Sequence, residues 1–474
     1  MPKRKHPKHP HHKLGQKSKK VTLKRDLGLV HAVSAGVGII SGAGIYALMG
    51  VATGMAGNSV WISFFFASLV AIFTGLSYAE LSSMFPKDAG EFIYADHAFG
   101  KKIAFLVGWL ILISGVIAIS TIALGFAGYF SKLFGIQNIL PVAILIIIVL
   151  SFINFYGVKE TAWLNILFTI IEVGGLVLII VAGISYFGAP GIDYLATPHG
   201  LRGLFSASAL IFFAFIGFES IIKLSEETKN PEEVIPKALI LSIIITTVLY
   251  ILVALSAVSV MGWEALGASS SPLADVAAIA FGSVAFKILS VIALISTANT
   301  MMISMMSTSR IAYGMGAEES LPKYLARIHS DRKTPWVAIS IVMTFSILFA
   351  LGGNIGLVAE MTNLTIYLTF LVVNMSLIML RYTYPDAKRT FKVPGKIGKT
   401  PILPVIGMAL VLFMLYHLKL LIIAGGIIFV LLGFVVYNWY DFIKKLAEHG
   451  WKGLEEMEKK ERKRWRKERK EEKK

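Results

Sequence analysis

Twelve stretches of this chain are apolar enough, and long enough or nearly so, to cross a lipid bilayer as helices. A helix needs about 20 predominantly apolar residues to span the hydrocarbon core. Hydrophobic residues make up 55% of the chain and charged ones 16%, a balance that soluble cores cannot hide. The sequence therefore predicts an all-α integral membrane protein with twelve transmembrane helices in a lipid bilayer. The predicted spans are residues 27–53, 60–84, 103–130, 139–156, 162–187, 204–223, 236–261, 285–313, 335–352, 357–380, 401–418 and 420–440.

The basic residues predict which side of the membrane each loop faces. If the N-terminal arm is cytoplasmic, the outside loops contain only Lys132, Arg202, Lys287 and Lys419, which leaves 42 of the 46 Lys and Arg residues inside. This asymmetry follows the positive-inside rule and predicts a multi-pass protein of the cell membrane with both termini in the cytoplasm.

The two ends of the chain are strongly basic or densely charged, and they account for much of the net charge of +17. Residues 1–26 form a basic arm and residues 441–474 a charged tail, and both patterns are typical of solvated segments beside a membrane. Nucleic acid is not an expected partner. Four histidines of the arm could bind zinc or nickel, but a polar arm without metal is the favoured interpretation. Because the chain has no cysteine, thiolate chemistry is excluded, and we expect no cofactor.

The first predicted span contains a run of glycines, Gly36-Val-Gly-Ile-Ile-Ser-Gly-Ala-Gly-Ile-Tyr46. Each glycine lowers helix propensity by about 1 kcal/mol relative to alanine, so the run favours unwinding at mid-membrane. Close packing between helices through small residues is the alternative. Unwound backbone is tolerated in a membrane only where it lines a polar cavity or is buried in protein.

The sixth predicted span contains a corresponding interruption, at Gly217 and the ionisable Glu219. Matching interruptions in two halves of a chain indicate an inverted-repeat transporter with its substrate at the bilayer midplane. We therefore predict two inverted five-helix repeats, residues 27–187 and 188–380, with broken helices one and six. A loop and two peripheral helices follow at 381–440. Freed amides attract a carboxylate and freed carbonyls accept from an ammonium, so the breaks suit an amino acid.

Ionisable residues inside predicted spans are candidates for function. Glu172 lies near the middle of the fifth span, where it could carry a proton or merely join helices by a hydrogen bond. Glu219 could titrate, or it could cap the second half of its broken helix. Glu80 and Glu360 lie near span ends, where we expect them to face an interface.

Four stretches, taken together, resemble the permeases of the amino acid–polyamine–organocation superfamily. They match the family's first span, the segment between the second and third spans, the sixth span with its following loop, and the loop after the tenth span. The stretches are Gly38-Ile-Ile-Ser-Gly-Ala-Gly-Ile-Tyr46, Tyr78-Ala-Glu-Leu81 with Phe85-Pro86, Phe213-Ala-Phe-Ile-Gly-Phe-Glu219 with Glu226-Glu-Thr-Lys-Asn-Pro231, and Arg381 with Arg389-Thr-Phe-Lys-Val-Pro-Gly395.

The resemblance implies ten core helices, two peripheral ones and transport by alternating access. It implies that the substrate carboxylate meets the backbone around Gly42, Ala43 and Gly44, next to Ser41. The ammonium would meet carbonyls near Ile40 and around Phe213, Ala214 and Ile216, with Phe213 as a lid. Glu172 stands where some proton-coupled relatives carry a lysine. An acid there replaces a positive group by one that could bind a cation or carry a proton itself. Acids at the Glu219 position take part in coupling in some relatives, and Thr297 and Thr300 could offer hydroxyls to an ion.

We therefore expect a secondary transporter of amino acids, coupled to protons rather than sodium. A neutral substrate is favoured because the third span shows no acidic group to pair with a cationic side chain. The alternatives are an exchanger of amino acids or polyamines without ion coupling, and a substrate sensor on the same fold. An enzyme is not expected, because the spans contain no HExxH or GxSxG motif.

Overall fold

The computed structural model describes residues 27–85, 90–157, 162–188, 191–226, 228–442 and 446, and nearly all of them are helical. The α-helices are α1 (Leu29–Ile40), α2 (Ala43–Ala56), α3 (Val60–Met84), α4 (Glu91–Phe99), α5 (Lys101–Phe134), α6 (Ile139–Tyr156), α7 (Ala162–Ile184), α8 (Gly200–Ile211), α9 (Pro231–Ala268), α10 (Pro272–Phe281), α11 (Ser283–Ala317), α12 (Trp336–Ala350), α13 (Ile355–Thr383) and α14 (Ile402–Tyr416). Short 3-10 helices are η1 (Gly57–Ser59), η2 (Phe212–Phe215), η3 (Phe218–Glu226) and η4 (Lys323–Ala326). A last helix, Leu420–Phe442, is called the C-terminal helix below.

Nine helical stretches of the described residues are long and apolar enough to cross a membrane. One of them, Ala43–Met84, joins α2, η1 and α3. Apolar helices of 10–17 residues occupy the predicted spans at 335–352 and 401–418. Every predicted span coincides with helical structure, which confirms an all-α membrane architecture. Whether all twelve cross the bilayer stays a prediction.

Both predicted interruptions are present. α1 ends at Ile40 and α2 begins at Ala43, so the first span breaks at Ser41 and Gly42. In the sixth span, α8 gives way to η2, and an extended Ile216 (ψ 135°) with a left-handed Gly217 (φ 118°) separates η2 from η3. The left-handed backbone at position 217 is one that glycine adopts without strain.

Two helices that the sequence did not predict are short. α4 follows α3 along the chain and packs on α5 and α13, while α10 follows α9 and packs on α11. The ten residues of α10 rise only about 15 Å at 1.5 Å per residue, too little to cross the hydrocarbon core. A search for spanning stretches therefore cannot find such helices.

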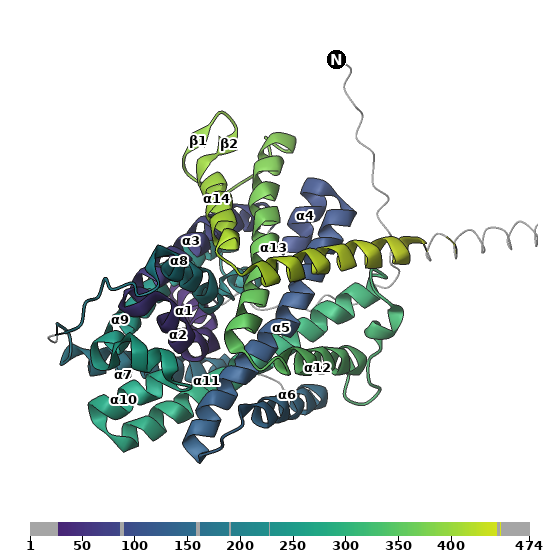
Figure 1. Ribbon diagram of the computed structural model, residues 1–474. Helices are drawn as coiled ribbons and strands as arrows, with labels where there is room; N and C mark the ends of the chain where they lie inside the picture. Colours follow the sequence, from purple (N-terminus) through teal and green to yellow (C-terminus); the bar gives the residue numbers. More distant parts are fainter. Residues whose placement is uncertain are drawn as a thin grey trace, which may run out of the picture.

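The broken helices lie inside the bundle, and the last two helices lie at its edge (Figure 1). α9 packs against α1, α2, α3 and η3, and α5 packs against α11 and α13. α14 packs along α13, and the small β1–β2 hairpin (Lys396–Ile397 with Thr400–Pro401) extends the loop between them. The outward faces present large apolar side chains, such as Leu420 and Leu421 of the C-terminal helix, 81% and 70% exposed. Such a surface suits lipid rather than water.

Candidate functional site

The two interruptions lie directly against each other. A Cβ atom built on Gly44 would lie 2.5 Å from the Cα of Ala214, closer than packed atoms approach. On the other side, a Cβ on Gly217 would lie 3.2 Å from the carbonyl oxygen of Ile39. Only glycine allows the backbones of the two broken spans to come this close.

A tyrosine from a third helix joins the two breaks. The hydroxyl of Tyr250, on α9, lies 2.8 Å from the carbonyl oxygen of Ile40 and 3.0 Å from that of Ala214. One hydroxyl hydrogen is therefore shared between the last carbonyl of α1 and a carbonyl of η2. The breaks leave carbonyls in the protein interior that need a hydrogen-bond donor. Tyr250, which is fully buried, supplies that donor.

A threonine from a fourth helix meets the start of α2. The backbone N–H of Ala43 donates to Oγ1 of Thr300, on α11, at 3.1 Å. A Cβ on Gly42 would lie 2.5 Å from the same Oγ1. Thr297 instead donates to the carbonyl of Ala293 in its own helix at 2.7 Å. Of the two predicted threonines, the structure thus brings only Thr300 into contact with the break.

Ser41, one of the two residues of the first break, carries a hydroxyl. Its Oγ is buried and has no hydrogen-bond partner among the described residues. A buried hydroxyl without a partner is uncommon and costs free energy, so it marks a place where a ligand could accept or donate.

Glu172 lies on α7 and contacts α2, the helix that follows the first break. Its side chain is 1% exposed, and Oε1 lies 3.5 Å from Nδ2 of Asn299, on α11. The hydroxyl of Tyr46, on α2, donates to the backbone carbonyl of Glu172 at 2.7 Å. Glu172 therefore sits where α2, α7 and α11 meet.

Glu219 takes the role of a helix cap. Its Oε2 accepts from the backbone N–H of Gly217 at 2.9 Å, at the beginning of η3. This contact satisfies one amide that the break frees, as the capping interpretation of the sequence expects. A part in proton coupling stays a prediction.

Most of the predicted ligand residues are buried, while Ile216 and Gly217 are partly exposed. Ile40, Ala43 and Ala214 are 2%, 1% and 1% exposed, and the predicted lid Phe213 is 6% exposed.

A second polar cluster, which the sequence analysis did not assemble, lies at the end of α3. The fully buried Glu80 accepts from Nε of Arg381 at 2.9 Å and from the N–H of Val393 at 2.7 Å. Nε of Arg389 lies 3.2 Å from the same carboxylate. Burial lowers the pKa of the Arg389 guanidinium, and the nearby Glu80 charge works against that shift. One carboxylate thus ties α3, α13 and the loop after α13 together.

Glu80, Arg381 and Arg389 all belong to the motifs that resemble the permease family, but nothing in those motifs shows that the three residues pair. Glu80 and Glu360, expected near the membrane interface, lie close to the end of α3 and the start of α13, and both are buried and ion-paired, Glu360 with Lys419 at 3.1 Å. The feature from which the pairing of Glu80 could have been suspected was its opposite charge to the two arginines of the later motif.

Replacing Tyr250 by phenylalanine tests the contact between the breaks. The ring stays, but two buried carbonyls lose their donor, so we expect the free energy of unfolding to fall by about 1–3 kcal/mol. Thermal unfolding in detergent measures this, with Tyr416→Phe, at an 80% exposed position, as the control. Equal melting temperatures for the two variants would show that the shared hydroxyl does not stabilise the breaks.

Comparison with known proteins gives a consistent result along the chain. A family model described as amino acid permease matches residues 27–440. The chain is 30% identical to the branched-chain amino acid permease BcaP of Bacillus subtilis, over 90% of this chain and 94% of that protein. It is 29% identical to the methylthioribose transporter of the same organism, over 92% and 97%. It is also 29% identical to the vacuolar cationic amino acid transporter 4 of Arabidopsis thaliana, over 77% and 64%.

Proposed function

The chain belongs to the amino acid permease family, and from this premise we propose that it is a secondary transporter that carries a neutral amino acid by alternating access. One observation supports the proposed site above all others. The carbonyls of Ile40 and Ala214, from two separate broken helices, converge on a single hydroxyl.

The proposed substrate site uses groups that the breaks release. Amides around Gly42, Ala43 and Gly44 and the unpartnered hydroxyl of Ser41 would face the substrate carboxylate. Carbonyls of Ile40 and of the η2 segment would accept from its ammonium, and the remaining predicted ligands are Phe213, Ala214, Ile216 and Gly217. Backbone groups are held by the helices around them, so they cost little reorganisation when they bind an ion.

The proposed architecture extends this site to the whole chain. Residues 27–187 and 188–380 would form inverted repeats in a cell membrane, with residues 1–26 and 441–474 in the cytoplasm. The isolated β-bridge between Leu27 and Thr228 supports part of this architecture. It joins the residues next to the start of α1 and the end of η3, which are the ends farthest from the breaks. These two half-helices would then move together.

A neutral substrate is favoured over a cationic one by the acids near the site. Glu219 accepts from the backbone N–H of Gly217, and Glu172 faces Asn299. Both carboxylates thus have partners within the protein, and neither arrangement indicates a site for a basic substrate side chain. The relatives named above include a branched-chain permease, a methylthioribose transporter and a cationic amino acid transporter. Their names therefore leave the substrate class to experiment.

A thermal-shift screen against the twenty amino acids and common polyamines, followed by counterflow in liposomes, tests the function. A ligand at 100 times its dissociation constant stabilises the folded protein by about 2.7 kcal/mol. We expect a subset of neutral amino acids to give this shift and to exchange across the membrane. Stabilisation by polyamines would indicate the exchanger of the alternative reading, and binding without counterflow would indicate a sensor.

Proton coupling rests on Glu172. A buried carboxyl between three helices can bind a proton when the site closes and release it when water enters. We expect Glu172→Gln to make uptake independent of a proton gradient while counterflow continues. Uptake at two external pH values measures this, and Glu264→Gln, an exposed position on α9, is the control. If both variants keep the wild-type pH dependence, Glu172 has no part in coupling.

A further inference from the structure

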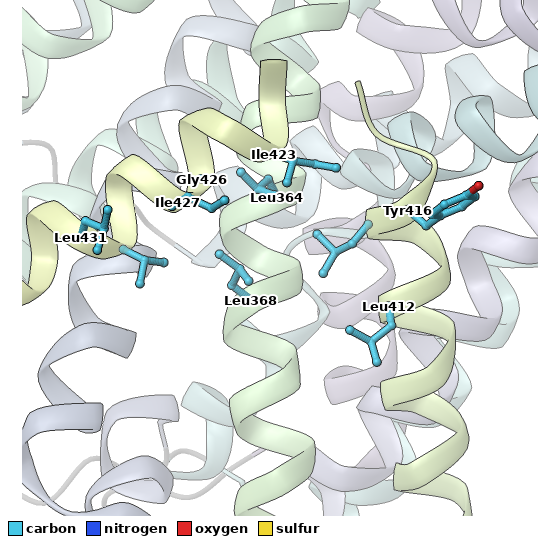
Figure 2. A pocket seen from close by; sticks show the side chains of 10 residues that line it. Leu364, Leu368, Leu412, Tyr416, Ile423, Gly426, Ile427 and Leu431 are labelled. Atoms are coloured by element: carbon cyan, nitrogen blue, oxygen red, sulfur yellow. The ribbon is translucent and has the colours of Figure 1, made fainter. Parts of the chain in front are cut away.

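An apolar pocket of about 360 Å³ opens between α13, α14 and the C-terminal helix (Figure 2). Leu364 and Leu368 of α13 face Leu412 of α14 across it, and Ile423 and Ile427 close it from the C-terminal helix. Apart from Tyr416 and Gly426, every lining residue is leucine, isoleucine or valine. The pocket is of the size that small ligands occupy and offers almost nothing to a polar one.

The walls of this pocket are held in place by a close helix contact. A Cβ on Gly426 would lie 2.1 Å from Cδ2 of Leu364. The C-terminal helix therefore approaches α13 so closely that a side chain at position 426 would displace the side chain of Leu364. The pocket beside this contact is a built feature of the bundle rather than a gap between loosely placed helices.

One end of the pocket is charged. Nζ of Lys419 lies 3.1 Å from Oε1 of the buried Glu360. Lys419 precedes the lining residue Ile423 by one helical turn, and Glu360 precedes Leu364 by one turn. At 1.5 Å per residue, the lining on α13 then reaches about 12 Å inward from this ion pair, to Leu368. That depth matches most of one leaflet of the hydrocarbon core, which is about 15 Å thick.

The charged end has an excess of positive groups. Lys419 is 57% exposed, while its partner Glu360 is 3% exposed. The hydroxyl of Ser206, on α8, donates to the carbonyl of His417 at 3.0 Å, which brings the start of α8 next to residues 417–419. Arg202 precedes Ser206 by one turn and is exposed. The exposed Lys419 thus lies at this end of the pocket, and the exposed Arg202 lies one turn along α8 from the residue that contacts His417.

We propose that this pocket binds one chain of an anionic membrane lipid, with the lipid phosphate at Lys419 and Arg202. The apolar lining suits an alkyl chain, and the cationic end lies where a headgroup must lie if the chain follows α13 inward. A second copy of the protein would need an interface of about 1,200 Å² or more, which a pocket of this volume does not supply by itself. The proposal does not depend on the transported substrate.

The test uses the full-length protein, delipidated in detergent and then titrated with phosphatidylglycerol while native mass spectrometry counts bound lipids. We expect one lipid per chain to bind more tightly than all others. Phosphatidylcholine should bind about fivefold more weakly at this site, since it lacks net charge. Inorganic phosphate should not displace the lipid, because the alkyl chain supplies most of the affinity.

Matched variants locate the site. Ile427→Trp fills the pocket, whereas Val435→Trp adds the same ring on the same helix at a 61% exposed position outside the lining. We expect only Ile427→Trp to lose the tight lipid. Arg202→Gln removes an exposed cation of the proposed headgroup site, and it should weaken phosphatidylglycerol binding about fivefold. Lys132→Gln, an exposed lysine at the end of α5, is its control.

Three results would overturn the proposal. The first is equal retention of the lipid by Ile427→Trp and Val435→Trp. The second is a set of equivalent lipids with no single tight one. The third is a dimer whose cross-links run through the C-terminal helix and which holds no lipid, since a second copy would then cover the pocket.

Discussion

Gly44→Val is expected to abolish substrate binding and transport. Even the first carbon of the new side chain would lie 2.5 Å from the Cα of Ala214, which is backbone and cannot rotate away. The two broken helices must then move apart, at a cost of about 1–3 kcal/mol for overpacking, and the groups around the breaks lose their mutual positions. Counterflow in liposomes and a thermal shift with the best substrate measure both effects.

The matched control is Gly314→Val. Gly314 also lies inside an apolar helix, α11, but a Cβ there meets nothing within 4 Å. We expect transport by this variant to stay within about twofold of the wild type, since an open position adds no clash. Wild-type affinity in Gly44→Val would remove the paired breaks from the substrate site.

Glu80→Gln is expected to cause the largest loss of stability. The carboxylate is the anion that Arg381 and Arg389 share in a buried place, at 11% and 4% side-chain exposure. The amide keeps the shape but not the charge, so two guanidinium groups lose their common counter-charge. Removing one partner of a buried ion pair costs about 3–5 kcal/mol. Thermal unfolding and the fraction of monodisperse protein after gel filtration measure the loss.

Glu232→Gln is the control for that variant. Glu232 pairs with Lys388 at 3.6 Å, and both side chains are partly or largely exposed, at 36% and 84%. Exposed pairs contribute about 0–1 kcal/mol, so we expect little change. A stability loss no greater in Glu80→Gln than in Glu232→Gln would mean that the cluster does not hold α3, α13 and the following loop together.

The long apolar helices and their two interruptions could be predicted from the sequence because their causes are local. A run of apolar residues commits a segment to the membrane wherever its neighbours lie. The glycines of residues 36–46 and Gly217 weaken the helix at their own positions, and the structure breaks at Ser41–Gly42 and at Ile216–Gly217. The candidate site follows from these breaks, and its ligand roles remain predictions.

The sequence by itself thus determined which segments form long apolar helices, where those helices are weak and which family the chain resembles. The tertiary structure decided which side chains meet at those weak places. Tyr250 reaches Ile40 from 210 positions away, and Arg381 reaches Glu80 from 301. Thr297 and Thr300 lie about one turn apart on α11, but only Thr300 lies level with the start of α2 and contacts it. Such contacts depend on how packed helices are rotated against one another, and hydrophobicity and helix propensity along a single segment carry no information on that rotation.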